Sequence, residues 1–235
     1  YLVDVVIVGG DWTNYQTLSV DPRWSKYFSA TGLKKSEIRN FANDRNITLL
    51  SYYEGLSLIP YFRDASGNNI FIETGTYKGE TTRVASDVGF KEVHSIELQD
   101  RLYEESIENL SDLIDIDKVF LHKGDSRIIL GEILSKINEK TTILLDAHID
   151  GGNYISGITP EIKKCPLYEE LNSIKNHKIK DHTIIIDDVR ILGKIGWGTE
   201  VLLDVIISMI MEINKDYKIS FDNGEIENDV LIAKI

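Results

Sequence analysis

The chain has 235 residues, 42% of them hydrophobic and 27% charged, which is enough for one α/β domain with an appended segment. Its formal net charge of −12 opposes binding to phosphate backbones and anionic lipid, so nucleic acid and membrane surfaces are poor partners. The single cysteine, Cys165, excludes an intramolecular disulfide and a cysteine-based zinc site, and it fits a cytoplasmic location.

Residues 1–65 differ in pattern from the rest, and we expect them to form a mostly helical cap segment against the sheet or over the site. They are rich in aromatic and polar residues and show no regular alternation of strands and helices. Residues 5–8 are apolar and precede Gly9-Gly10, as at a dinucleotide-binding turn. Since neither the later glycine nor an apolar helix follows, we interpret this run as an ordinary strand or an oligomer contact.

From about residue 69 onward, apolar runs alternate with amphipathic segments. Strands are expected at residues 70–72, 93–98, 119–122, 142–145 and 183–186. Helices are expected at residues 80–88, 100–113, from an N-cap at 126, 166–175 and 201–213, the last being too short for a membrane span. Two further β-prone runs, 217–221 and 229–235, are joined by a segment with Asp222-Asn223-Gly224 and predict a terminal hairpin.

This order predicts an α/β fold. Residues 66–235 should form a Rossmann-like, doubly wound, mostly parallel sheet with an antiparallel C-terminal hairpin, and residues 1–65 the N-terminal cap. Ligands bind such sheets beyond the carboxyl ends of the strands, near the switch in strand order. We therefore look for functional residues directly after each strand.

The first three strands each end in residues suited to a nucleoside ligand. Gly75, in the turn after the first strand, allows close approach of a ligand to the backbone. Glu97 ends the second strand, 22 residues later, where a carboxylate can accept ribose hydroxyls. Asp125, after the third strand, can accept an adenine amino group, with Ser126 beside it. The alternative is a set of solvated loop carboxylates with an N-cap at Ser126.

The next two strands end in acidic residues. Asp146-Ala147-His148 follows one strand and Asp187-Asp188 follows the other. If the two strands are neighbours, three carboxylates meet and repel one another unless a cation or a shared proton intervenes. Oxygen ligands favour Mg²⁺, Mn²⁺ or Ca²⁺, and such an ion can acidify a substrate hydroxyl. The alternatives are a loop-capping acidic pair and a structural histidine.

The segment Glu73-Thr74-Gly75-Thr76-Tyr77-Lys78-Gly79-Glu80-Thr81 resembles the first motif of the class I S-adenosylmethionine-dependent methyltransferases. It is similar to the Gly-Thr-Tyr-x-Gly version of the metal-dependent O-methyltransferases, with Tyr77 in place of the middle glycine. Together with the acidic pair, it resembles the metal-dependent sugar O-methyltransferases of antibiotic biosynthesis. The catechol and caffeoyl relatives have an Asn as third ligand, which is absent beside Asp187.

The resemblance implies an enzyme that transfers a methyl group to a hydroxyl of a sugar or other small polar acceptor. It assigns Glu73 and the Gly75 turn to the methionine moiety, Glu97 to the ribose and Asp125 to the adenine. It makes Asp146, Asp187 and Asp188 the ligands of Mg²⁺ or another divalent cation, and it places His148 at the position of the general base, with Asp150 as a rival. The cofactor-binding set it predicts is Glu73, Gly75, Thr76, Tyr77, Gly79, Thr81, Glu97, Asp125 and Ser126.

Other readings stay open. A nicotinamide-dependent oxidoreductase lacks support from a G-x-G-x-x-G turn, and a non-catalytic adenosyl-binding module would need no metal. Residues 151–166 form either a lid or a plain surface loop, so Tyr154 and Arg190 are candidates for acceptor contact. Cys165 and Trp197 are expected to be packing residues. The acceptor and any homo-oligomer are left open by the sequence.

Overall fold

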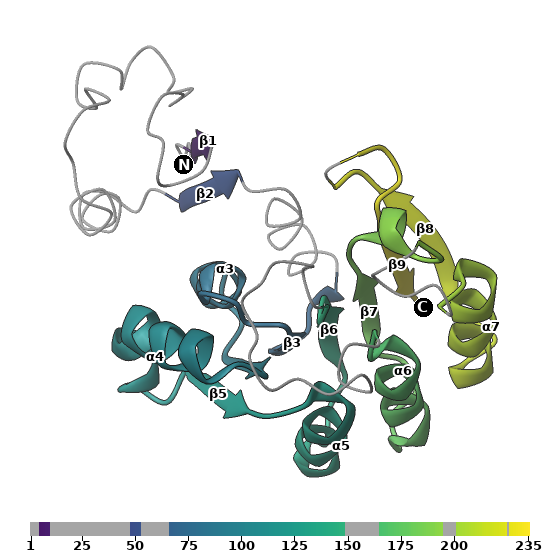
Figure 1. Cartoon of the computed structure of the whole chain (residues 1–235), viewed down its shortest axis with the longest axis horizontal. Helices are drawn as coiled ribbons and strands as arrows, with labels where there is room; N and C mark the ends of the chain where they lie inside the picture. Colours follow the sequence, from purple (N-terminus) through teal and green to yellow (C-terminus); the bar gives the residue numbers. More distant parts are fainter. Residues whose placement is uncertain (1–4, 10–47, 53–65, 149–164, 195–200, 225) are drawn as a thin grey trace.

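The computed structural model describes residues 5–9, 48–52, 66–148, 165–194, 201–224 and 226–235. Its main feature is a seven-stranded sheet flanked by helices (Figure 1). The strand order is β5-β4-β3-β6-β7-β9-β8. The strands are β3 Ile70–Thr74, β4 Glu92–Glu97, β5 Val119–Lys123, β6 Thr141–Leu145, β7 Thr183–Ile186, β8 Lys218–Asp222 and β9 Val230–Lys234.

The first five of these strands are parallel, and β9 runs antiparallel to both β7 and β8. This confirms the predicted mostly parallel sheet with an antiparallel C-terminal hairpin. Strands β3, β6 and β7 are buried along their whole length, because helices cover both faces of the sheet there. That is why they appear in the sequence as continuous apolar runs.

Helices α3 Glu80–Asp87 and α4 Asp100–Ile114 pack on one face of the sheet. Helices α5 Ser126–Lys136, α6 Leu167–Asn176 and α7 Leu203–Ile213 pack on the other face (Figure 1). Each face has its own apolar cluster, centred on Phe71 and Leu110 on one side and on Ile143 and Leu171 on the other. The molecule therefore has three layers, helix, sheet and helix.

The strand order changes direction between β3 and β6. From β3 the chain builds outward through β4 to β5, and it then returns to place β6 and β7 on the opposite side of β3. Such a switch point opens a crevice at the carboxyl ends of the two central strands. The turn after β3 and the loop after β6 therefore begin at the place where a ligand is expected.

One detail at the start of α5 corrects the prediction. Asp125, rather than Ser126, is the N-cap, because its side chain accepts a hydrogen bond from the N–H of Arg127. Ser126 is the first residue of the helix, and it is buried.

In the N-terminal segment the structure describes two strands. They are β1 Val5–Gly9 and β2 Thr48–Tyr52, which pair in parallel in a sheet of their own. The apolar run at residues 5–8 is thus a strand, as predicted, whereas β2 was not anticipated. The remainder of the expected helical cap lies outside the described residues. Within the described part of the chain, no helix is long and apolar enough to cross a membrane.

Candidate functional site

The turn after β3 approaches the loop after β6 so closely that Gly75 has no room for a side chain. A Cβ on Gly75 would lie 2.7 Å from the backbone oxygen of Asp146, and the glycine also has φ +89°. The N–H groups of Gly75 and Thr76 both donate to the carbonyl of Ile96, at 3.0 and 3.2 Å. The turn is thereby held between the ends of β4 and β6, at the switch point of the sheet.

Tyr77 stands where the general motif has its middle glycine. It adopts φ +51°, a left-handed conformation that is uncommon for a residue with a side chain. Its ring is 60% exposed, and its N–H donates to Oε2 of Glu97 at 2.9 Å. The turn therefore keeps the shape that a glycine would allow, while the tyrosine ring extends toward solvent.

Glu97, the predicted ribose ligand, is buried at the end of β4. One oxygen accepts the N–H of Tyr77 and the other accepts the N–H of Gln99, at 2.9 and 2.8 Å. Burial raises the pKa of this carboxyl, and the hydrogen bonds from backbone N–H groups oppose the rise. These contacts hold Glu97 beside the Gly75 turn, and the carboxylate keeps acceptor capacity for a ligand.

Glu73 lies beneath the turn and is almost fully buried. Its Oε2 accepts from the hydroxyls of Thr82 and Ser95, both at 2.6 Å, and Thr81 also hydrogen-bonds the carboxyl. Burial raises the pKa of Glu73 to about 8. Among the described residues, its Oε1 has no hydrogen-bond partner. The predicted methionine ligand is thus an internal support of the turn with one oxygen unsatisfied.

Asp125 pairs with Arg127 at the start of α5. The Nε of Arg127 lies 2.9 and 3.0 Å from the two carboxylate oxygens, and its Nη2 lies 2.8 Å from Oδ2. The predicted adenine ligand is therefore a half-buried carboxylate already fixed by an arginine. Its role toward adenine stays a prediction.

The acidic residues after β6 and β7 are brought together as predicted. Leu145 pairs with Ile186 in the parallel register, so Asp146 and Asp187 follow at adjacent strand ends. Burial raises the pKa of Asp187 to about 7, and the nearby charges of Asp146 and Asp188 add to the rise. Burial likewise raises the pKa of Asp146. Both carboxyls are thus held where their charged forms are costly.

His148 sits between two of these carboxylates. Its Nδ1 lies 3.4 Å from Oδ1 of Asp146, and its Nε2 lies 3.4 Å from Oδ2 of Asp188. Burial alone would lower the pKa of this imidazole, but its hydrogen bond with Asp146 and the charges of the neighbouring aspartates outweigh burial and raise it. The rival base, Asp150, and the loop residue Tyr154 lie outside the described residues, as does Trp197.

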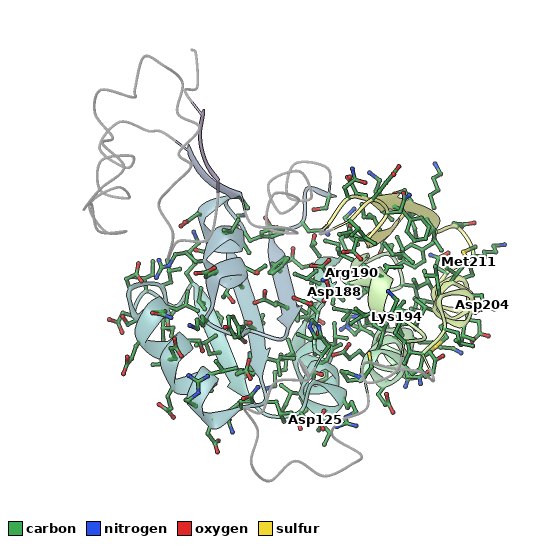
Figure 2. All side chains as sticks on the ribbon, turned by 45° about the horizontal axis from the view of Figure 1, so that its top comes forward. Asp125, Asp188, Arg190, Lys194, Asp204 and Met211 are labelled. Atoms are coloured by element: carbon green, nitrogen blue, oxygen red, sulfur yellow. The ribbon has the colours of Figure 1, made fainter. Side chains whose placement is uncertain are left out.

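Two residues outside the predicted ligand and base set complete the acidic cluster. Asp229, just before β9, is fully buried, and it accepts from the backbone N–H of Arg190 at 2.9 Å. The guanidinium of Arg190 bridges Asp188 and Asp229. Figure 2 shows Asp188 and Arg190 close together around the short 3₁₀ turn η1, Val189–Ile191, with Asp125 at a distance near α5. Arg190 was foreseen only as a candidate acceptor contact, and Asp229 was not foreseen.

Two overlapping sets of side chains in the described structure have the spacing of metal ligands. Ligand atoms of Asp146, His148 and Asp188 lie within 4.8 Å of one another, and so do those of Asp187, Asp188 and Asp229. The predicted trio is therefore divided between the two sets, which share Asp188. Asp188 itself has φ +59°, a left-handed backbone conformation that is uncommon for a residue with a side chain.

Comparison with known proteins supports the architecture. A methyltransferase from Geobacter sulfurreducens has a TM-score of 0.52 and 16% identity, over 92% of this chain and 97% of that one. A putative caffeoyl-CoA O-methyltransferase from Staphylococcus aureus has a TM-score of 0.50 and 14% identity, over 90% and 95% of the two chains. The chain has the class I methyltransferase fold.

A third structure shares this fold and contains S-adenosylhomocysteine. It is the methyltransferase PaMTH1 of Podospora anserina, with a TM-score of 0.50 and 15% identity over 77% of each chain. No protein-family model matches the sequence, and no curated protein matches it. The predicted resemblance to methyltransferases is thus confirmed for the fold, and the roles of individual residues stay predictions.

Proposed function

We propose that this chain is an S-adenosylmethionine-dependent O-methyltransferase that uses a divalent cation, in the first place Mg²⁺, and acts on a hydroxyl of a sugar or another small polar acceptor. One observation carries the proposal. The acidic loops after β6 and β7 converge beside the Gly75 turn, where the Gly75 backbone is in contact range of the Asp146 carbonyl. A turn suited to a nucleoside ligand and a carboxylate cluster suited to a cation therefore lie side by side at the switch point of the sheet.

The residues after β3, β4 and β5 fit the cofactor. Gly75 lets the turn pack directly against the backbone of Asp146, where a Cβ would lie 2.7 Å from the Asp146 carbonyl oxygen. Glu97 and Asp125 end adjacent strands and offer carboxylate oxygens for ribose hydroxyls and an adenine amino group. We assign Glu73, Thr76, Gly79 and Thr81 to the turn, and Tyr77 and Ser126 to contacts with the cofactor. When bound, S-adenosylmethionine supplies a methyl group already activated by its sulfonium.

The acidic cluster fits a hard divalent cation. Asp146, Asp187 and Asp188 supply carboxylate oxygens, the ligand type that Mg²⁺ and Mn²⁺ prefer. The raised pKa values of Asp146 and Asp187 are what uncompensated negative charge in a crevice produces. When bound, the cation would orient the acceptor hydroxyl and lower its pKa.

His148 is our candidate for general base, acting next to Asp146. Asp146 and Asp188 flank its two ring nitrogens and hold the ring at the centre of the cluster. The carboxylates also raise the pKa of His148, which strengthens the neutral ring as a base. Proton removal by this residue then requires a pH at which the imidazole is neutral.

The acceptor class and the setting of the enzyme complete the proposal. A cluster of four aspartates disfavours anionic acceptors and suits a polar, hydroxyl-rich group such as a sugar, free or on a larger product. The net charge of −12 argues against nucleic acid and anionic membranes as partners. We propose a cytoplasmic location from the lone cysteine. The nicotinamide alternative loses ground because β1, which ends at Gly9, belongs to a separate two-stranded sheet.

The first experiment is calorimetric titration of S-adenosylhomocysteine into the full chain, with Mg²⁺ and with a chelator. Micromolar binding is expected in both conditions, because Gly75, Glu97 and Asp125 are in place without a cation. No binding in either condition would overturn the methyltransferase proposal. Transfer of labelled methyl to a panel of sugar acceptors, abolished by chelator and restored by Mg²⁺, then tests acceptor class and metal dependence separately.

A further inference from the structure

The first turn of α6 carries a carboxyl group buried against the candidate cofactor site. Glu170 is 1% exposed, whereas its neighbour Glu169 faces solvent. A buried carboxyl is costly unless its oxygens are hydrogen-bonded, and Oε1 of Glu170 has no partner among the described residues. No step of the proposed reaction uses this group, so its position calls for an explanation.

The partners of Glu170 lie on two elements of the cofactor site. Thr74 is the last residue of β3, Ser126 is the first residue of α5, and the hydroxyls of both hydrogen-bond the Glu170 carboxyl. Oγ1 of Thr74 also accepts the backbone N–H of Asp146 at 3.2 Å. One side chain from α6 thus connects the Gly75 turn, the loop of Asp146 and the start of α5.

We propose that Glu170 is a positioning residue that sets the spacing between the adenine end of the cofactor site, at Asp125 and Ser126, and its methionine and metal end, at Thr74 and Asp146. This inference rests on the proposed function. Helix α6 packs beside α5, so a shift of either helix would move Ser126 relative to Thr74. Because Glu170 holds both hydroxyls, it limits that movement.

The charge environment is consistent with this role. Burial raises the pKa of Glu170 to about 7, and the neighbouring charges of Asp125 and Asp146 add to the rise, while the two hydroxyls oppose it. The charges of residues at both ends of the site, Asp125 and Asp146, therefore act on this carboxyl. Glu73 supports the turn from below in a similar way, but its hydroxyl partners all lie on the α3 and β4 side.

A residue that sets a distance should matter only to a ligand that spans that distance. The test compares calorimetric affinities of Glu170→Gln and wild type for S-adenosylhomocysteine, which reaches both ends, and for adenosine, which reaches one. We expect about a tenfold loss of affinity for S-adenosylhomocysteine and less than about a twofold change for adenosine. Glu169→Gln, one residue away and exposed, is the matched control and should bind both ligands as wild type does.

A second variant covers the case in which Glu170→Gln fails to fold. Thr74→Val removes one hydroxyl partner, keeps the shape of the side chain and leaves Glu170 in place, and the same split between the two ligands is expected, with a smaller loss. Equal weakening of both ligands, or no change in either, would overturn the inference and leave Glu170 as a structural residue. Absence of S-adenosylhomocysteine binding to the wild type would instead overturn the proposed function, so the two failures are distinguishable.

Discussion

The two halves of the candidate site differ in the partners that their carboxylates have. In the cofactor half, at the ends of β3, β4 and β5, each carboxyl takes hydrogen bonds or an ion pair from close neighbours, as Glu97 does from the N–H groups of Tyr77 and Gln99. In the acidic half, at the ends of β6 and β7 and the start of β9, four carboxylates converge around Asp188 and share the side chains of His148 and Arg190 as partners. The cofactor half is organised without a ligand, whereas the acidic half keeps negative charge that a cation would neutralise.

The largest effect should come from Asp187→Asn. Removing one carboxylate from the acidic half is expected to lower methyl transfer about 100-fold or more and to abolish its response to Mg²⁺. Affinity for S-adenosylhomocysteine should stay within about threefold, because the cofactor half is intact. Steady-state rates with a magnesium titration measure the first effect and calorimetry the second, with the exposed Asp204→Asn as control. Full activity in Asp187→Asn would indicate a metal-free mechanism and remove the contrast between the halves.

Gly75→Ala tests the contact between the two halves. The added Cβ would lie 2.7 Å from the Asp146 carbonyl, and φ +89° disfavours any side chain. We expect about a 30-fold loss of S-adenosylhomocysteine affinity, which corresponds to about 2 kcal/mol, and lower stability in a denaturant titration. Gly89→Ala is the matched control, since Gly89 has φ +101° but no atom within 4 Å of a Cβ built there. Equal affinity losses in both variants would mean that backbone strain, and not the contact, matters.

Arg190→Gln tests how far the guanidinium of Arg190 compensates the negative charges of Asp188 and Asp229. The variant leaves Asp229, which is fully buried, without the guanidinium that bridges it to Asp188. Since Arg190 is partly exposed, we expect a moderate loss of about 2 kcal/mol in the free energy of unfolding. Chemical denaturation measures it, and added Mg²⁺ should recover part of the loss. The double variant Arg190→Gln, Asp229→Asn should be more stable than Arg190→Gln alone; a less stable double variant would contradict the charge argument.

The smallest effect concerns the amino-terminal end of the parallel strands, opposite to the candidate site. His182, just before β7, is buried; its Nε2 lies 2.8 Å from Nδ1 of His177, and its Nδ1 accepts the N–H of Thr141. Burial lowers the pKa of His182 to about 4. The unfolded chain then binds a proton that the folded chain does not, so stability is full above pH 6.5 and falls below it.

Between pH 7 and pH 5.5 this histidine should cost about 1 kcal/mol in the free energy of unfolding. Urea titrations at the two pH values measure the loss, and His182→Asn should show a smaller pH dependence. An unchanged pH dependence in the variant would assign the acid sensitivity to other groups, such as His122, whose pKa burial also lowers to about 4. Neither outcome alters the comparison of the two halves, because His182 lies away from both of them.

The cofactor half could largely be predicted from the sequence because its signals are local. A strand, a glycine turn and a helix follow one another within residues 70–87. Each of the next two strands is likewise followed by a helix, with an acidic residue, Glu97 or Asp125, between or at the junction of strand and helix. What the sequence did not reveal there is which acids face a ligand. Glu170 stands in a Glu-Glu pair that is typical of a solvated helix face, and only the packing of α6 on α5 buries it.

The acidic half could be predicted only in part. Asp146 and Asp187 follow parallel neighbours, so their meeting was foreseeable from strand order. Asp229 lies 42 residues after Asp187 in the sequence, and it reaches the cluster because β9 runs antiparallel to β7, with Ile186 opposite Leu231. An aspartate at the start of a terminal strand thus meets the carboxyl end of another strand, and this depends on pairing that periodicity does not specify.

By itself, the sequence determined the α/β class, the positions of the strands of the main sheet and the residues that follow them, because apolar periodicity and turn residues act over short stretches of chain. Tertiary structure alone decided which of those carboxylates are satisfied by neutral donors and which face one another. It also decided that Arg190 bridges Asp188 and Asp229 and that Glu170 lies beside the candidate site. Burial and charge pairing depend on what packs against a residue, and contacts between distant segments supply that packing.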